Sequence, residues 1–164
     1  MKKYIGVKEI NAKPMNRLDY NMFRGWELPA DENGSDEGYL VEYIDGGQAN
    51  TKEYKGYISW SPKDVFERAY RPVDGMSFGL AIEAIKKGYK VARKGWNGKG
   101  MFIYYVPANK YPMSNNLLKT MAGRYEDDLV PYQAYIAFKT VDDTVVPWVA
   151  SQTDILAEDW EVAE

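Results

Sequence analysis

The stretch SFGLAIEAIKKGYKVARKGWNGKGMFIYY, from Ser77 to Tyr105, contains consecutive elements of a small fold. Its first residue is a suitable helix N-cap, the apolar residues after it recur at helical spacing, and Gly88 is a suitable helix stop. We expect a strand at residues 89–93 and another at 101–106, joined by a Gly-Trp-Asn-Gly turn. The stretch therefore predicts a helix followed by two strands. The apolar stripe of that helix would consist of Leu80, Ile82, Ala84 and Ile85.

The second informative stretch is VVPWVASQTDILAEDW, from Val145 to Trp160. Ser151 and Asp154 have the spacing of a capping box, in which each residue bonds the backbone N–H of the other. The chain after Gly75 therefore predicts an α+β fold, with a small antiparallel sheet and short helices. Its remaining expected elements are a helix at 115–121, a strand at 132–139, a turn at Asp142-Asp143, a strand at 144–148, a helix at 151–157 and a strand at 160–162; the rest of 107–131 stays unassigned.

The residues before this fold predict a small α+β extension. The segment RPVDG, 71–75, has the composition of a connection, so we place the boundary between residues 1–74 and 75–164. Ser61 is expected to cap the last helix of the extension, with Pro62 in its first turn. The expected elements are a strand at 4–10, a helix at 17–23, an exposed acidic loop at 28–38, a strand at 39–44 and a helix from 61 to about 70.

The composition limits the classes of function. The 164 residues carry a net charge of -3, which disfavours binding to long nucleic acids but leaves a small nucleotide as a ligand. The chain has no Cys and no His, so disulfides, thiolate metal sites and the commonest general base are excluded. The 14 tyrosines and 5 tryptophans exceed what a core of this size needs, and such an excess is typical of ligand walls and interfaces. We expect no catalytic residue, no metal and no cofactor.

The sequence also predicts where the protein is found. Its N-terminus lacks the apolar core of a signal peptide, and no stretch approaches the roughly 20 apolar residues of a membrane span. We therefore expect a cytoplasmic protein that binds no membrane.

The strongest candidate site is RKGWNGKG, residues 93–100, which combines cations, glycines and an indole. Glycines let a ligand approach the backbone, and Trp96 is suited to stacking on a base while Asn97 reads an edge of it. Arg93 and Lys94 are candidates for contact with phosphate. A hairpin turn with Trp96 packed in the core explains the same residues.

The second candidate site surrounds the expected helix after Trp148. A helix N-terminus offers free N–H groups to a phosphate, so Ser151 could lie beside an anion. A plain N-cap with Trp148 in the core is an equally good interpretation. The paired acids Asp127-Asp128 and Asp142-Asp143 fit solvated turns better than a metal site or a catalytic dyad.

Taken together and in this order, the two stretches resemble the phage Thoeris anti-defence proteins of the second type. The resemblance covers about residues 76–162 and rests on GWNGKGM and WxASQTDxLAEDW. It implies a homo-oligomer, often a tetramer, that sequesters cyclic nucleotide signals of bacterial immunity without cleaving them, in the cytoplasm of the infected host. Glycocyclic ADP-ribose is the main such signal, and some members of that family capture cyclic di- or trinucleotides. Residues 1–74 have no counterpart in the shorter members, and residues 107–132 match weakly.

The resemblance also implies site residues. Trp96 would stack on the adenine, Asn97 would hydrogen-bond beside it, and Arg93 and Lys94 would approach the pyrophosphate. The further contacts would come from the second motif, through Trp148, Ser151 and Asp154. Two alternatives remain open: a phosphodiesterase or glycohydrolase that uses two convergent carboxylates, and a structural module whose aromatic residues form an assembly surface.

Overall fold

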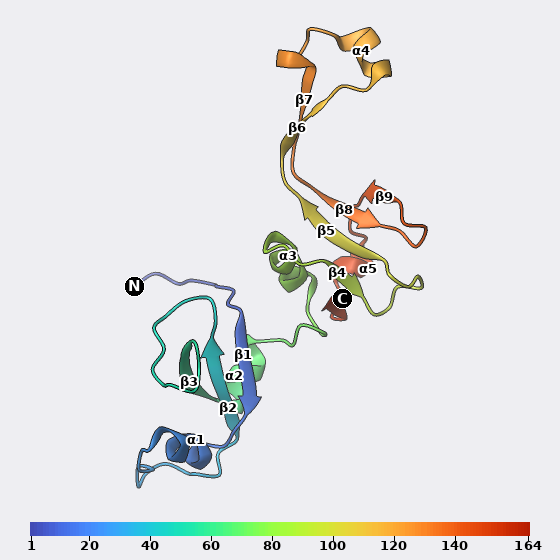
Figure 1. Ribbon diagram of the computed structural model, residues 1–164. Coiled ribbons are helices and arrows are strands. Elements are labelled where there is room, and N and C mark those ends of the chain that lie inside the picture. The colour runs from blue at the N-terminus through green and yellow to red at the C-terminus, as the bar shows by residue number, and fades with distance from the viewer. The chain divides into compact units, whose positions relative to one another are not determined.

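The computed structural model describes residues 1–164 and contains two compact units, Met1–Arg71 and Pro72–Glu164 (Figure 1). We call them the N-terminal unit and the C-terminal unit. Short helices and small antiparallel sheets make up both, so the α+β class predicted from the sequence is confirmed. The expected boundary after residue 74 lies close to the division between the units. No helix combines the length and the apolar character that crossing a membrane requires.

The N-terminal unit is a three-stranded antiparallel sheet with two helices. Its strands are β1 (Ile10–Pro14), β2 (Gly38–Tyr43) and β3 (Tyr57–Pro62), in the order β1-β2-β3. Its helices are α1 (Arg17–Arg24) and α2 (Lys63–Ala69). Tyr20 of α1, Leu40 of β2 and Ile58 of β3 form its buried core.

Local sequence sets both ends of α1. The side chain of Asn16 accepts a hydrogen bond from the backbone N–H of Asp19, as an N-cap does. Gly25 follows the helix with φ +68°, a left-handed conformation that glycine adopts without steric cost. This helix was expected at residues 17–23 and is confirmed.

Two expectations for the N-terminal unit are wrong, and one strand was not expected. Residues 4–9 form no strand. β1 begins only at Ile10, which pairs with Tyr43, the last residue of β2. The strand β3 was not predicted. Ser61 belongs to β3, so Pro62 takes the N-cap position of α2 without a side-chain hydrogen bond. Strand pairing, which local propensity does not reveal, decides all three.

The C-terminal unit contains a five-stranded antiparallel sheet in the order β10-β4-β5-β8-β9. Because β10 pairs with β4, the last strand of the chain lies beside the strand that precedes the Gly-Trp-Asn-Gly turn. This pairing brings the two informative stretches of sequence together. The strands are β4 (Val91–Arg93), β5 (Phe102–Val106), β8 (Tyr135–Lys139), β9 (Val145–Pro147) and β10 (Trp160–Val162).

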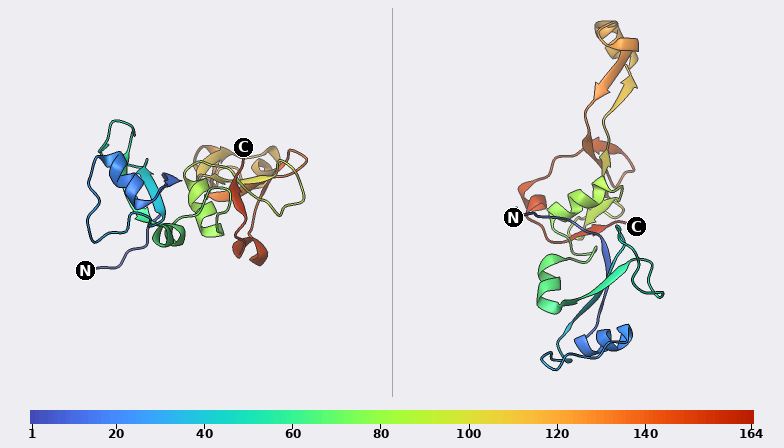
Figure 2. Two further views of the ribbon diagram at one scale, coloured as in Figure 1. Left: turned by 90° about the horizontal axis from the view of Figure 1, so that it is seen from below. Right: turned by 90° about the vertical axis from the view of Figure 1, so that its left-hand side faces the viewer.

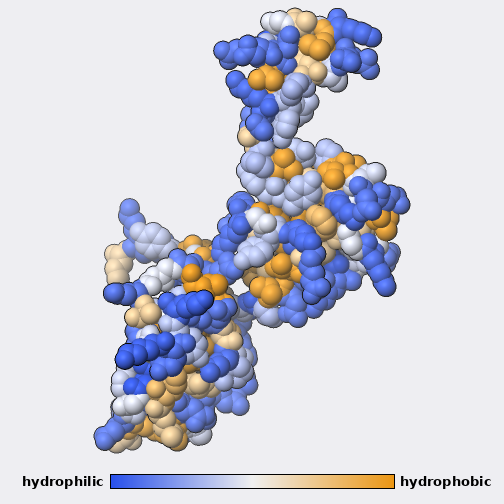
Figure 3. Space-filling view, viewed as in Figure 1, coloured by the Kyte–Doolittle hydropathy of each residue, from blue (hydrophilic) through white to orange (hydrophobic).

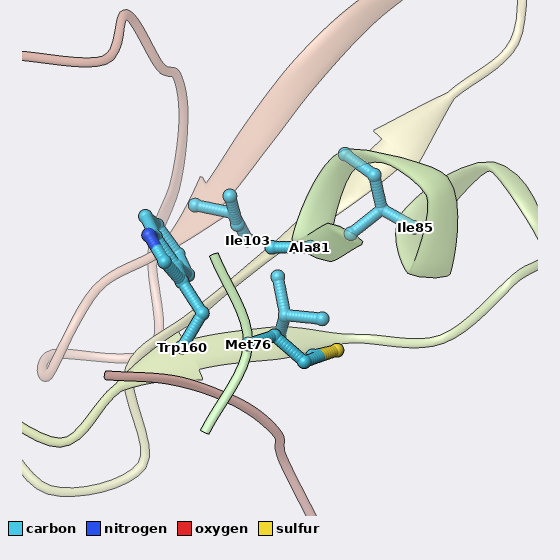
Figure 4. Packing of buried hydrophobic residues seen from close by; sticks show 6 residues of the cluster. Met76, Ala81, Ile85, Ile103 and Trp160 are labelled. Atoms are coloured by element: carbon cyan, nitrogen blue, oxygen red, sulfur yellow. The ribbon is translucent and has the colours of Figure 1, made fainter. Parts of the chain in front are cut away.

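The core of the C-terminal unit lies between this sheet and α3 (Phe78–Lys86). Figure 4 shows Ala81 and Ile85 of the helix meeting Ile103 of β5 and Trp160 of β10. Ser77 stands at the N-cap position as expected, although its side chain accepts no capping hydrogen bond. The predicted stripe was partly wrong, since Ala81 is buried and was not included.

A hairpin continues from β5 and β8 as an arm, which we define as residues 107–134. It consists of β6 (Asn109–Pro112), α4 (Asn115–Met121), a short 3-10 helix (Glu126–Asp128) and β7 (Leu129–Tyr132). β6 and β7 pair only with each other, and the arm projects from the five-stranded sheet (Figures 1 and 2). The helix at 115–121 is confirmed. The two arm strands were not predicted, and Tyr132 belongs to β7 rather than to the strand expected at 132–139.

The other predicted elements of the C-terminal unit are confirmed with small shifts in their ends. They include the strands around residues 91–93, 102–106, 145–147 and 160–162, and the helix α5 (Gln152–Ile155). The predicted capping box is present: Ser151 accepts from the N–H of Asp154, whose carboxylate accepts from the N–H of Ser151.

Candidate functional site

The turn after β4 is held by hydrogen bonds to Asp159, the residue that precedes β10. The backbone N–H of Lys94 donates to the carbonyl of Asp159 (3.1 Å), and the N–H of Gly95 donates to the Asp159 carboxylate (2.9 Å). The N–H of Trp96 donates back to the carbonyl of Arg93 (3.2 Å). A side chain at position 95 would crowd the carboxylate, because its Cβ would lie 3.0 Å from Asp159 Oδ2. Asp159 therefore anchors the turn that presents Trp96.

Arg93 connects two carboxylates beneath this turn. Its Nε lies 2.8 Å from Asp159 Oδ1 and its Nη1 lies 2.9 Å from Asp154 Oδ1. The three side chains are mostly removed from solvent, with exposed fractions of 19% for Arg93, 13% for Asp154 and 32% for Asp159. Two partners on one guanidinium fix its orientation, as its rigid fork of donors allows.

The pKa values follow from this arrangement. The hydrogen bonds that Arg93 donates to Asp159 and to Asp154 raise the pKa of Arg93, and the hydrogen bond from Arg93 lowers the pKa of Asp159. Burial alone would raise the pKa of Asp154, but hydrogen bonds from Ser151 and Arg93 outweigh burial and lower it. Both acids are therefore ionised at neutral pH.

Asp154 joins the ion pairs to the aromatic side chains. Its Oδ2 accepts from the Ser151 hydroxyl (2.6 Å), and its Oδ1 lies 3.5 Å from the indole Nε1 of Trp96, at the long limit of a hydrogen bond. Its backbone carbonyl accepts from the indole of Trp160 (3.0 Å). Asp154 thus contacts the N-cap residue, the guanidinium of Arg93 and the indoles of Trp96 and Trp160.

Three tryptophans and Phe138 form an aromatic cluster over the core. Trp96 lies 5.2 Å from Phe138, 5.5 Å from Trp160 and 6.3 Å from Trp148 between ring centroids, each pair edge to face. Trp160 is fully buried, whereas Trp96 and Trp148 are only partly buried. Trp96 and Trp148 are therefore the indoles of this cluster that keep exposed surface.

The structure brings most of the predicted site residues into one place. Arg93, Trp96, Trp148, Ser151 and Asp154 all belong to this connected group. Asn97 is exposed on the turn next to Trp96. Lys94 is also exposed, and its Nζ lies 3.9 Å from Asp74 at the surface.

The alternative interpretation of RKGWNGKG also finds support in the structure. The segment does form a turn, and Trp96 packs against the core of the C-terminal unit. Because that indole remains partly exposed, packing and ligand contact are compatible roles for it. Its role in binding stays a prediction.

Sequence reasoning missed three members of the group: Asp159, Phe78 and Phe138. Phe78 of α3 packs against Trp148 and Trp160 (6.2 and 5.5 Å between centroids). The sequence showed no pair of convergent carboxylates, yet Asp154 and Asp159 converge on Arg93. The position of Asp159 next to Trp160 was the available signal, since β10 pairs with β4 there.

A shallow hollow of about 420 Å³ lies elsewhere in the C-terminal unit. Phe102 and Tyr104 of β5 line it together with Lys90, Lys139 and Val145. These β5 residues alternate with the buried Ile103, so they lie on the sheet face opposite α3. No predicted site residue lines this hollow. Trp96 and Trp148 of the aromatic cluster are partly exposed at the surface, and neither lines this hollow.

Comparison with known proteins relates the C-terminal unit to a protein family. A family model described as the Thoeris anti-defense 2-like domain matches residues 76–163, which include the arm. The chain is also similar to the Thoeris anti-defense 2 protein of Bacillus phage SP01. The two are 40% identical over 87 residues, which cover 53% of this chain and 93% of the phage protein.

Proposed function

Because this chain belongs to the Thoeris anti-defense 2-like family, we propose that it binds and sequesters a cyclic nucleotide signal of the glycocyclic ADP-ribose type without cleaving it. It would act in the cytoplasm of the infected bacterial host. Cyclic di- and trinucleotides are the related ligands to compare. The observation that carries the proposal is the convergence of both family motifs on the group around Trp96.

Trp96 would supply the stacking surface. A base stacked on an aromatic side chain gains about 1–3 kcal/mol, and stacking requires no titrating group. Asn97 is exposed beside it on the same turn and offers both a donor and an acceptor to the edge of a base. Trp148 would form an adjoining wall of the site.

The two cations would have different roles: Arg93 would position other groups, and Lys94 would contact the ligand. Arg93 is neutralised by two acids, so its first role would be to hold the turn and α5 together. Lys94 is exposed on the same turn as Trp96, and its role would be to approach a phosphate. Ser151 would add a hydroxyl at the start of α5, where Asp154 orients it.

We further propose that a second copy of the chain completes the site. Apolar side chains stand exposed near the aromatic cluster, with exposed fractions of 89% for Val149 and 75% for Leu156. Figure 3 shows hydrophobic residues at the surface of the C-terminal unit. Exposed apolar patches of this kind mark interaction sites, and a surface patch such as the one around Trp96 would gain enclosure from a neighbour. A tetramer is the assembly that the family resemblance favours.

The electrostatics of the acids favour binding over catalysis. A hydrolase that uses two carboxylates needs one of them protonated as the acid, with a raised pKa. The convergent pair has the opposite property, because the pKa values of Asp154 and Asp159 are both lowered. No group of three or more acidic residues that could hold a metal ion occurs in the structure.

Capture and release of the signal test the proposal. Purified protein is incubated with glycocyclic ADP-ribose, the complex is separated from free nucleotide by filtration, and the bound fraction is released by heating. We expect depletion of the signal from the filtrate and recovery of the intact molecule by mass spectrometry. Recovery of a cleaved product, or no depletion at all, would overturn sequestration.

Trp96→Ala provides the site-specific arm of this experiment. We expect it to abolish capture while the circular dichroism spectrum stays that of the native fold. Tyr132→Ala is the matched control, because Tyr132 is an exposed aromatic residue on the arm. Retained tight binding in Trp96→Ala would contradict the site, and native mass spectrometry of the same samples would report the oligomeric state.

A further inference from the structure

The N-terminal unit contains an open hollow of about 550 Å³ that the function proposed above does not use. It lies between α1, the loop that follows α1, and β3. Its aromatic lining consists of Tyr20, Trp26, Tyr57 and Trp60. The volume falls within the range of about 300–1,000 Å³ that is common for small-molecule sites.

The aromatic rings are held in fixed positions. Tyr20 is buried and meets Trp26 edge to face, with 6.2 Å between ring centroids. The indole of Trp60 donates a hydrogen bond to the carbonyl of Met15 (2.9 Å). Trp26 and Tyr57 remain 53% and 46% exposed. The hollow therefore offers two exposed flat rings above a fixed aromatic base.

Hydrogen-bond donors and hydrogen-bond acceptors lie among these rings. Asn21 is buried and donates its amide N–H to the carbonyl of Arg17 (2.9 Å), which leaves its amide oxygen as an acceptor. Arg17 supplies donors, and Glu27 and Glu32 supply acceptors. Ser59 supplies a hydroxyl, which serves as either. The mixture suits a ligand whose own groups both donate and accept, as hydroxyls do.

The charges argue against phosphorylated and cationic ligands. Two carboxylates and one guanidinium line the hollow, and Glu32 already pairs with that guanidinium, Arg17 (2.7 Å). The lining therefore offers a phosphate no unpaired cation. Cations already lie over two of the rings, with Arg17 4.3 Å from the centroid of Trp60 and Arg24 4.4 Å from that of Trp26. An ammonium ligand would compete with these guanidiniums for the aromatic faces.

We infer that this hollow binds a neutral saccharide. A sugar ring has an apolar C–H face that fits against Tyr57, or against the face of Trp26 opposite the guanidinium of Arg24. Its hydroxyls both donate and accept, which matches the polar groups of the hollow. The N-terminal unit would then have a ligand chemically different from that of the C-terminal unit. The inference does not depend on nucleotide capture.

Nuclear magnetic resonance titration of the full-length ¹⁵N-labelled chain tests the inference. The probes are tri-N-acetylchitotriose, maltotriose and cellotriose, with AMP and trimethyllysine as the anionic and cationic comparisons. The five indole N–H signals are assigned by Trp→Phe substitutions. We expect a saturable shift of the Trp26 and Trp60 signals with at least one trisaccharide, and no shift of these signals with AMP or trimethyllysine.

Two variants locate the effect. Trp26→Ala should weaken saccharide binding about tenfold or more, from the loss of one stacked ring. Because Trp26 is half exposed, the circular dichroism spectrum should stay native. Glu27→Gln, which keeps the shape and removes a charge, should weaken binding less. Trp96→Ala is the matched control in the other unit and should leave the titration unchanged.

Three outcomes would overturn the inference. None of the trisaccharides moves the Trp26 or Trp60 signal, AMP or trimethyllysine moves them instead, or Trp26→Ala binds saccharide as tightly as the native chain. Each outcome is separate from a failure of nucleotide capture, because that is measured with a different ligand and depends on Trp96.

Discussion

The two units both place arginines beside tryptophans, but they use the charges differently. In the C-terminal unit, Arg93 forms ion pairs with Asp154 and Asp159. These charges form a small network that holds the turn carrying Trp96. In the N-terminal unit, Arg17 and Arg24 lie over the faces of Trp60 and Trp26. The charges of the C-terminal unit position Trp96, whereas each arginine of the N-terminal unit lies over one face of a tryptophan ring.

The difference predicts different sensitivities. A network of ion pairs loses its geometry when one member is removed, and its strength depends on pH. A guanidinium stacked on a ring contributes less and involves no group that titrates near neutral pH. Mutations that unfold or loosen one unit should therefore leave the other almost unchanged, since each unit has its own core.

Trp160→Ala should have the largest effect. Trp160 is fully buried at the centre of the C-terminal core, and removing a buried Trp costs about 3–5 kcal/mol. We expect calorimetry to show a strong loss of stability in one transition and a second transition that keeps its midpoint. Equal loss in both transitions would contradict the independence of the two units.

Arg93→Ala should have the next largest effect. It leaves two partly buried acids without their cation, and we expect a loss of about 2 kcal/mol, between the values for exposed and buried pairs. Chemical denaturation measures the loss. Arg24→Ala is the comparison in the N-terminal unit and should cost less. An effect of Arg24→Ala as large as that of Arg93→Ala would show that the ion pairs and the stacked guanidinium stabilise their units equally.

Acid should weaken the C-terminal unit by a smaller amount. The pKa values of Asp154 and Asp159 lie below their usual 3.8, so the unfolded chain takes up protons first as the pH falls. Their contribution is complete above that value and is lost as the pH falls through the lowered pKa values. Thermal unfolding from about pH 5 down to about pH 1 measures this loss, and Asp159→Asn should flatten the C-terminal transition's dependence on pH.

The smallest effects should come from a matched pair of N-cap variants, Asn16→Ala in α1 and Ser151→Ala in α5. Each removes a capping hydrogen bond, and such losses cost about 1 kcal/mol. Only Ser151 also hydrogen-bonds the carboxylate of Asp154, so only Ser151→Ala should weaken nucleotide capture as well. A filtration assay on both proteins distinguishes the two roles, and equal capture by both would confine Ser151 to capping.

Much of the fold follows from local signals in the chain. The helices α1, α3, α4 and α5 carry their own start signals or apolar spacing, and the capping box of α5 was readable from Ser151 and Asp154. Those signals depend on contacts within a few residues, which the order of amino acids sets directly. Strands without such signals were missed: β3, β6 and β7 are defined by partners far along the chain.

In the candidate site, too, the sequence revealed residues with local signals and did not reveal contacts between distant segments. Sequence motifs identified Trp96, Trp148 and Asp154, but they did not reveal that Asp159 anchors the turn or that Arg93 is neutralised. Those facts require β10 to lie beside β4, a pairing between residues 91–93 and 160–162. The aromatic hollow of the N-terminal unit likewise requires α1 and β3 to come together.

The order of amino acids therefore specifies the chemical groups of this protein: stacking rings, glycine-rich turns, no His and no Cys, and a family motif in two parts. Packing of the strands and helices sets which charged side chains pair, which indole is buried and which indoles stay partly exposed. The physical reason is that caps and turns depend on neighbouring residues. Ion pairs and cores depend instead on strand pairing between distant segments, whose register no local pattern specifies.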